Sequence, residues 1–316
     1  MVQKNAVTKQ DTSRAGAQLT ATAEAFHTAV DECVQDADPD AVHRVRTGSR
    51  RLQAMLEATL RENAGSALQQ TAKAWLRPLK QIRRAAGEVR DLDVHRKLLE
   101  SWASKESPIP EAASASLLHE QAQVLDTWLK GERKHLAHGM QKQVRKRQQG
   151  LAERQAAFLA ALGSLPAGSS RGARSTDAVA LEDFVRSVDA MPLLDAENLH
   201  EFRKATKKAR YVAESGAAGQ AESSVAKALK RIQDAIGEWH DWVCLREEAE
   251  AVVGKDAPEL MAFLERQVER HFVLAMKTTQ TTRARLSGEW MAISKQTVKR
   301  PPATVGIDHS RVVSGF

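Results

Sequence analysis

The apolar residues of this chain recur every three or four positions, which places them on one face of an α-helix. Val45, Leu52 and Leu56 form one such series. β-branched residues are scattered, and no run alternates between apolar and polar positions over several residues, as a half-buried strand would. The pattern therefore predicts an all-α protein. The expected helices cover residues 13–36, 40–63, 66–86, 88–105, 111–137, 140–162, 178–190, 195–216, 220–237, 239–253 and 257–286.

Proline, glycine and capping residues mark the boundaries between these helices. In Asp38-Pro39-Asp40, Pro39 is expected to end one helix and Asp40 to cap the next, and Pro78 is expected to kink or split the third helix. Residues 163–172 combine glycine, serine and proline and are the clearest linker. The expected parts of one domain are a first helical bundle at residues 15–162, a linker at 163–177, a second bundle at 178–290 and an irregular tail at 291–316.

Two motifs occur twice, in the same order and at nearly the same offset. The first, residues 43–53 (HRVRTGSRRLQ), returns at residues 200–210 (HEFRKATKKAR), an offset of 200 − 43 = 157. The second, residues 79–91 (LKQIRRAAGEVRD), returns at residues 229–241 (LKRIQDAIGEWHD), an offset of 229 − 79 = 150. Such repetition predicts two duplicated helical bundles of the four-helix type. We expect a pseudo-two-fold axis to bring equivalent faces together around a basic central channel.

The first motif places cations along one helix face, because positions 0, 3, 7 and 10 fall within about 80° of one another. Arginine suits phosphate since its planar fork donates two parallel hydrogen bonds, whereas lysine acts as a mobile point charge. Histidine adds a donor that becomes cationic near its ordinary pKa of about 6.5. Two matching stripes indicate a polyanion surface rather than two solvated helix faces. They comprise His43, Arg46, Arg50 and Gln53 in one copy and His200, Arg203, Lys207 and Arg210 in the other.

The second motif places a glycine on a basic face in each copy. A glycine in mid-helix costs about 1 kcal/mol relative to alanine. Two interpretations are open: the glycine ends a helix and permits a turn, or it leaves a gap that another backbone or a ligand can approach. The residues that share this face are Lys80, Gly87 and Arg90, repeated as Lys230, Gly237 and His240.

Composition limits the classes of partner. The 316 residues carry a formal charge of +7, which favours anionic partners, but aromatic residues are only 4% with a single tyrosine, too few for a base-stacking surface. No apolar run approaches the ~18 residues of a membrane span, and the N-terminus lacks a secretory signal. Cys33 and Cys244 are expected to be buried, reduced side chains. We predict a cytoplasmic protein without membrane partner or cofactor.

Catalytic and metal-binding patterns are weak. Asp91, Asp93 and Asp241 could hold Mg²⁺, but pairing with arginine or helix capping accounts for them more simply. His135 and His138 have a metal-ligand spacing, yet the sequence indicates no third ligand. Glycine-rich phosphate loops of the Walker or dinucleotide type are absent. We therefore expect a protein that is not an enzyme.

Both motifs in both copies resemble the CHAD family, the conserved histidine α-helical domain. The resemblance covers residues 15–290 and implies two four-helix bundles around a basic pore, binding of inorganic polyphosphate and association with polyphosphate granules. Gln53 departs from it, since the family pattern often has arginine there, and His240 stands where the first copy has Arg90. The implied polyphosphate-binding residues are His43, Arg46, Arg50, Arg51, Lys80, Arg90, His200, Arg203, Lys207, Lys208, Arg210, Lys230 and His240.

The function we expect is therefore non-catalytic binding of inorganic polyphosphate through a channel lined by lysine, arginine and histidine. Two alternatives stay open: binding of a nucleic-acid backbone, RNA in particular, and an accessory or catalytic part in the hydrolysis of phosphate chains. The resemblance also points to CYTH domains, triphosphate-cleaving partners with which CHAD domains are often associated. Their ExExK signature is absent from this sequence, so we do not transfer that activity.

Overall fold

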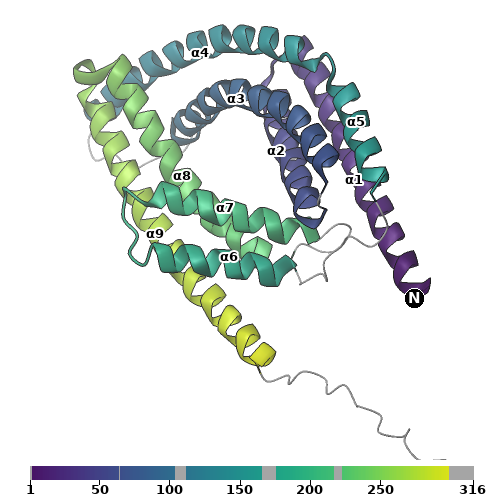
Figure 1. Ribbon diagram of the computed structural model, residues 1–316. Helices are drawn as coiled ribbons and strands as arrows, with labels where there is room; N and C mark the ends of the chain where they lie inside the picture. The colour runs from purple at the N-terminus through teal and green to yellow at the C-terminus, as the bar shows by residue number, and fades with distance from the viewer. Residues whose placement is uncertain (1, 64, 104–111, 166–175, 217–222, 299–316) are drawn as a thin grey trace, which may run out of the picture.

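The computed structural model describes residues 2–63, 65–103, 112–165, 176–216 and 223–298 (Figure 1). Over these residues it contains nine α-helices, one short 3-10 helix and no strand, which confirms the predicted all-α class. The elements are α1 (Val2–Gln35), α2 (Pro39–Glu62), α3 (Ser66–Ala103), α4 (Ala112–Gln148), α5 (Leu151–Gly163), α6 (Thr176–Ala190), α7 (Leu199–Gly216), α8 (Ser224–Val252), η1 (Gly254–Asp256) and α9 (Pro258–Val298).

Side-chain caps begin two of the helices that carry the basic motifs. Asp38 precedes α2, and its Oδ1 accepts hydrogen bonds from the backbone N–H groups of Asp40 at 2.8 Å and Ala41 at 3.0 Å. Ser223 precedes α8 and accepts from the N–H of Ala226 at 3.0 Å. These bonds satisfy N–H groups that the first helical turn leaves unpaired. The predicted break before α2 is thereby confirmed, but the cap is Asp38 and not Asp40, and Pro39 begins α2 instead of ending the helix before it.

Helix α3 is continuous where the sequence predicted two helices, over residues 66–86 and 88–105. Pro78 lies inside it and does not split it, and the helix follows a curved path (Figure 1). A proline inside a helix removes one backbone hydrogen bond and favours a bend. Gly87 is also interior, because buried Val89 and its apolar neighbours pack α3 against the core and outweigh the propensity cost of about 1 kcal/mol.

Helix α8 is likewise one continuous helix, Ser224–Val252, where the sequence predicted two helices, over residues 220–237 and 239–253. Ile236 and Trp239 are buried on either side of Gly237, so the same packing argument applies. The interpretation in which these glycines end helices is therefore wrong, because each lies inside a continuous helix and leaves a gap in its side-chain layer.

Other boundaries also differ from the prediction. The break expected near residue 138 lies instead at Gly150, whose φ of 77° is a left-handed conformation that glycine adopts readily. Helix α9 continues to Val298, past the predicted end at 286, so residues 291–298 are helical rather than an irregular tail. The remainder of the predicted tail, residues 299–316, and most of the predicted linker, residues 166–175, lie outside the described residues.

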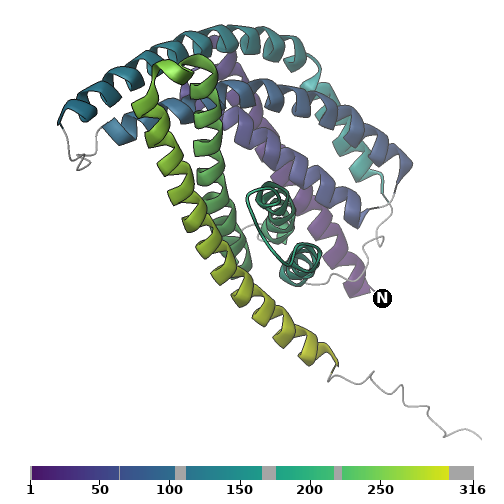
Figure 2. The same cartoon turned by 90° about the vertical axis from the view of Figure 1, so that its left-hand side faces the viewer.

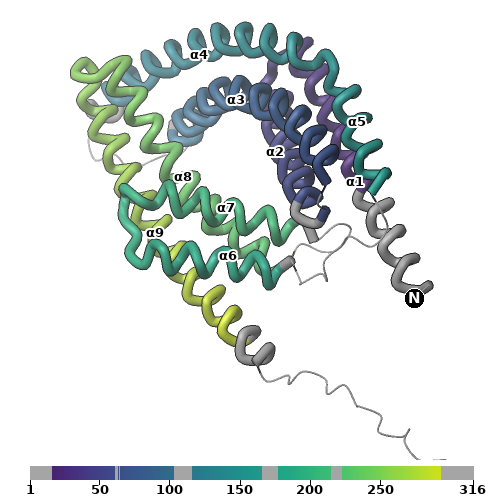
Figure 3. Tube along the Cα trace, in the orientation of Figure 1, coloured from purple at the N-terminus to yellow at the C-terminus, as the bar shows by residue number. Residues whose placement is uncertain are grey.

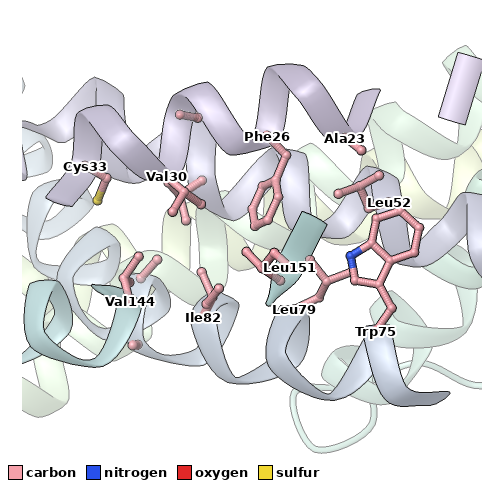
Figure 4. Packing of buried hydrophobic residues seen from close by; sticks show 14 of the residues in the cluster. Ala23, Phe26, Val30, Cys33, Leu52, Trp75, Leu79, Ile82, Val144 and Leu151 are labelled. Atoms are coloured by element: carbon pink, nitrogen blue, oxygen red, sulfur yellow. The ribbon is translucent and has the colours of Figure 1, made fainter. Parts of the chain in front are cut away.

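Apolar side chains gather in three clusters. The first joins α1 to α5, and Figure 4 shows Phe26 of α1 facing Trp75, Leu79 and Ile82 of α3. Cys33 is buried there, as predicted, whereas Cys244 of α8 is only half-buried. The second cluster joins α6 to α9. The third lies where the two halves of the chain meet and draws on the ends of α3 and α8 with α4 and α9; its buried residues include Leu92, Leu125, Trp242 and Leu264.

The helices are arranged so that the two basic motifs come together. Helix α4 arches over α3, and α8 and α9 run side by side as a long antiparallel pair (Figures 1 and 2). Helix α2 contacts α7, and α3 contacts α8, across the middle of the molecule. Figure 3 follows the same path along the Cα trace. Among the described residues, no helix holds an apolar stretch that could cross a membrane.

Two polar contacts between side chains brace the helices near the junction. His95 of α3 lies 2.5 Å from Glu248 of α8, measured from Nδ1 to Oε2. Arg133 of α4 donates to Asp93 Oδ1 at 2.6 Å and to the carbonyl oxygen of Ala37 at 2.6 Å. The Asp93 side chain is 2% exposed. Asp93 is therefore the partner of an arginine, as the simpler interpretation of the sequence predicted.

We predict that Asp93→Ala lowers the free energy of unfolding by about 3 kcal/mol, because it leaves the Arg133 charge buried without its carboxylate. Urea denaturation followed by circular dichroism measures this change. The control is Asp234→Ala, which removes an exposed partner of Lys230 and should cost no more than about 1 kcal/mol. Equal losses in the two variants would show that the Asp93 pair contributes no more than a surface pair.

Candidate anion-binding site

The two copies of the first motif lie on α2 and α7, which contact each other. In each helix the apolar face is buried: Val45 and Leu52 in α2 and Phe202 in α7 are fully inaccessible. The helical period then leaves the cationic residues on the remaining face. Packing on one side of each helix therefore determines where the charges on the other side converge.

A pocket of about 420 Å³ lies between α2, α3 and α7. Five of its lining residues are cationic and one, Glu57, is a carboxylate. Glu57 accepts a hydrogen bond from Gln53 Nε2 at 2.6 Å. An excess of cations of this size in one pocket creates a positive potential that attracts anions. The lining residues are Arg50, Gln53, Ala54, Glu57, Arg83, Lys204, Lys207, Lys208 and Tyr211.

The centre of the cluster is short of negative charge. In the part of the chain that the structure describes, Arg50, Arg203 and Lys207 form no ion pair. Burial, followed by the charge of Arg46, lowers the pKa of Arg50 to about 10. Burial and then the charges of Arg50 and Arg203 lower the pKa of Lys207 to about 7. Both pKa values are lowered for the same reason: burial and the neighbouring cations make the charged form of each side chain less favourable.

Carboxylates are found at the other end of the stripes. Arg46 lies 3.5 Å from Asp91 of α3, measured from Nη2 to Oδ1. Burial raises the pKa of Asp241 of α8, and the charge of Arg203 is the strongest opposing influence. Asp91 and Asp241 occupy equivalent positions of the second motif, since 91 + 150 = 241. Each half of the chain thus places an aspartate near the first arginine of its stripe.

Of the predicted histidines, His200 and His240 are half-buried and His43 is exposed. The rings of His200 and His240 have centroids 4.8 Å apart, and His240 Nδ1 lies 3.4 Å from the Sγ of Cys244. Burial is the main cause that lowers the pKa of both histidines. Burial and then the charge of Arg90 lower the pKa of His43. All three therefore become cationic only at a pH below the 6.5 assumed from sequence.

Other predicted residues do not line this pocket. Lys230 pairs with Asp234 at 2.6 Å, and Arg210 pairs with Glu214 at 3.0 Å, in each case one turn along its own helix. Arg51 and Lys80 are exposed. Arg90 lies close enough to His43 to lower its pKa, and Lys208 lines the pocket as an exposed lysine. The predicted set thus divides into Arg50, Lys207 and Lys208 in the pocket, Arg46, Arg203, His43, Arg90, His200 and His240 beside or beyond it, and Arg51, Lys80, Arg210 and Lys230 elsewhere.

Sequence reasoning missed Arg83, Lys204 and Tyr211 of the pocket wall. Arg83 could have been found, because it lies three residues after Lys80 and four before Gly87, on the face already singled out. Its guanidinium donates a hydrogen bond to Gln53 Oε1, and burial lowers its pKa. Lys204 and Tyr211 carry no comparable signal, since only the approach of α7 to α2 brings them to the pocket.

The gap at the second glycine is filled by an arginine. A Cβ added at Gly237 would lie 3.1 Å from Nη2 of Arg203, whereas a Cβ at Gly87 would meet nothing within 4 Å. Gly237 therefore lets the Arg203 guanidinium lie close against α8. This supports the close-approach interpretation for Gly237 and leaves open space at Gly87.

Metal candidates from the sequence are not assembled. Asp91 and Asp93 face arginines, and over the described residues no group of three or more histidine, cysteine, aspartate or glutamate side chains is placed to hold a metal ion. His135 and His138 instead line a shallow hollow of about 630 Å³ between α4 and the end of α1, together with Lys134.

The comparisons agree with this fold. A family model described as CHAD domain matches residues 17–250. The crystal structure of the CHAD domain from the plant Ricinus communis is similar, with a TM-score of 0.57, 20% identity, and coverage of 87% of this chain and 91% of that chain. PptA from Streptomyces chartreusis is similar with a TM-score of 0.60, 15% identity, and coverage of 88% and 99%. At these identities the two structures support the fold alone. No curated protein matches the chain.

We predict that Gly87→Ala raises the free energy of unfolding by about 0.5–1 kcal/mol, because alanine favours the helix and its Cβ meets open space. Gly237→Ala should gain less, since the Arg203 guanidinium has to move away from the new methyl group. Urea denaturation of both variants measures the difference. Equal gains would show that Arg203 is not held against Gly237.

We also predict that Lys207→Met stabilises the ligand-free protein, most strongly below pH 7. Lys207 holds its proton up to about pH 7 in the fold but up to the ordinary 10.5 in the unfolded chain. The unfolded state therefore binds more protons between these values, so the wild-type penalty is full below pH 7 and fades as pH rises toward 10. Melting at pH 6 and pH 9 tests this, at roughly 2–4 °C for each kcal/mol. A gain in Tm that does not change with pH would assign the effect to apolar packing.

Proposed function

The chain belongs to the CHAD domain family, and from this premise we propose that it binds inorganic polyphosphate without cleaving it. The observation that supports the proposal is the pocket between α2, α3 and α7, where five cations face one carboxylate. Arg50 and Lys207 at its centre form no ion pair in the described part of the chain. Such a pocket is a site for a ligand that supplies several negative charges at once.

Polyphosphate suits this pocket better than a nucleic acid does. A phosphate chain needs cations and hydrogen-bond donors, which Arg50 and Arg83 supply through their planar forks. Recognition of single-stranded RNA normally adds aromatic side chains on which bases stack, and Tyr211 is the one aromatic residue of the lining. A binder of the RNA backbone alone is the competing case, and a direct competition between the two polyanions separates them.

Binding rather than hydrolysis is proposed because of the donor set. Hydrolysis of phosphate chains usually uses Mg²⁺ held by several carboxylates. Glu57 is the one carboxylate of the lining and accepts a hydrogen bond from Gln53. Asp91 lies beside Arg46 instead. We extend the proposal to polyphosphate granules, to which a protein with this pocket would attach through the exposed phosphate chains.

We predict that Arg83→Ala weakens binding of long-chain polyphosphate roughly tenfold or more, the loss expected for a charge-assisted hydrogen bond. The slope of log K against log salt should become shallower by about 0.7, since one phosphate contact is lost. Titrations at three salt concentrations, with RNA as competitor at equal phosphate, measure both quantities. Wild-type binding should persist when RNA is added.

The matched control is Arg84→Ala, which removes the next residue of α3. The Arg84 side chain is 87% exposed and does not line the pocket. Its removal lowers the net charge by the same amount and should change affinity less than twofold. If the two variants bind equally, the pocket is not the site. If RNA displaces polyphosphate at equal phosphate, nucleic acid is the preferred ligand and the proposed function is wrong.

A further inference from the structure

Lys207 differs from the other lysines of the pocket in what surrounds it. Lys204 is exposed and pairs with Glu201 at 2.5 Å, and Lys208 is exposed. Lys207 is half-buried and forms no ion pair within the described residues. Its position in the middle of α7 directs it toward α2, where the first stripe lies.

The groups that face Lys207 come from three helices and are almost all cationic. Arg46 and Arg50 approach from α2, Arg83 from α3 and Arg203 from its own helix α7. His200 of α7 also lies within its electrostatic reach. The other titratable groups of the pocket are Glu57, Lys204, Lys208 and Tyr211.

Because of these neighbours, Lys207 is the group of the pocket that can lose its proton and become neutral. An arginine does not lose its proton at any physiological pH, so the four guanidiniums stay charged. An ammonium placed among them can become a neutral amine, and this relieves both the repulsion and the burial of a charge. In agreement with that geometry, burial and the four arginines lower the pKa of Lys207 to about 7.

We propose that Lys207 takes up a proton when a polyanion fills the pocket, and that this step makes the pocket select ligands with closely spaced negative charges. The inference rests on the proposed function. The Nζ lone pair of the neutral amine accepts a proton from the acid form of the buffer, the conjugate base of the buffer is left behind, and the resulting ammonium contacts the ligand. No other bond changes.

Proton uptake by Lys207 depends on how closely the negative charges of the ligand are spaced. Neighbouring phosphates of polyphosphate share an oxygen atom, whereas those of RNA are separated by a sugar. A pocket of about 420 Å³ therefore encloses more negative charge from polyphosphate than from RNA. Only the denser ligand offsets the repulsion from four arginines strongly enough to hold Lys207 in its charged form. RNA should bind with Lys207 largely neutral and gain little from it.

The test is the pH dependence of binding between pH 7.5 and 9. One proton taken up makes the polyphosphate affinity of the wild type fall by up to about tenfold per pH unit, because the free protein has lost the proton that the complex needs. The affinity for RNA should fall less than about threefold per unit. Calorimetry at pH 8 in two buffers of different ionisation enthalpy should count close to one proton for polyphosphate.

Lys207→Arg is the decisive variant, since arginine stays charged throughout this range. It should bind polyphosphate with a nearly flat pH profile, take up no proton, and bind RNA relatively more tightly than the wild type does. The matched control is Lys227→Arg, the same change at an exposed lysine of α8 outside the pocket, which should keep the wild-type profile. Circular dichroism at each pH verifies the fold.

The outcomes separate this inference from the proposed function. Absence of polyphosphate binding by the wild type even at pH 6.5 would overturn both. Tight binding with a flat wild-type profile, or a slope that persists in Lys207→Arg, would leave the proposed function standing and overturn the role of Lys207. Equal proton uptake for RNA and polyphosphate would refute selection by charge spacing.

Discussion

The cationic side chains of α2 and α7 lie close together because the opposite, apolar faces of the two helices are packed in the protein core. Leu52 of α2 and Phe202 of α7 are completely buried in separate cores, and a third cluster joins the two halves. Turning either helix to separate Arg50 from Lys207 would expose one of these apolar faces. Burial of a large apolar side chain is worth about 1.5–3 kcal/mol, so several together outweigh the repulsion between a few partly solvated cations.

The same logic explains what could be predicted from sequence. Helical period and apolar spacing predict which side of α2 and α7 is basic, and the structure places Arg50, Lys207 and Lys208 in the lining of one pocket. The distances between helices are decided by packing between residues far apart in the chain. Tyr211 therefore enters the pocket without any local signal. Helix propensity also predicted a helix end at Gly87, because it describes a residue in an isolated helix. In α3 the neighbours of Gly87 are buried in a core, and this packing keeps the helix continuous.

The charge balance of each residue was the least predictable feature. Arg46 and Arg203 occupy equivalent positions, since 46 + 157 = 203, yet Arg46 lies beside Asp91 while Arg203 lies against Gly237. Arginine and glutamine are also exchanged between the two copies. Gln53 corresponds to Arg210 at the offset of 157, and Arg83 corresponds to Gln233 at the offset of 150. The arginine that the first stripe lacks at Gln53 is thus supplied from α3, where Arg83 donates to Gln53.

This exchange concentrates the site at one end of the stripes. At the Arg50 end, cations from α2, α3 and α7 meet one carboxylate, whereas at the Arg46 end Asp91 and Asp241 offset the charge. Burying cations without acids destabilises the empty protein, and a polyanion that supplies the missing charge stabilises it through binding. A cluster made of arginine alone would keep its full repulsion in the empty state. With a lysine at the centre, the empty pocket can release one charge, so the proportion of lysine to arginine, more than the net charge of +7, sets which anion is preferred.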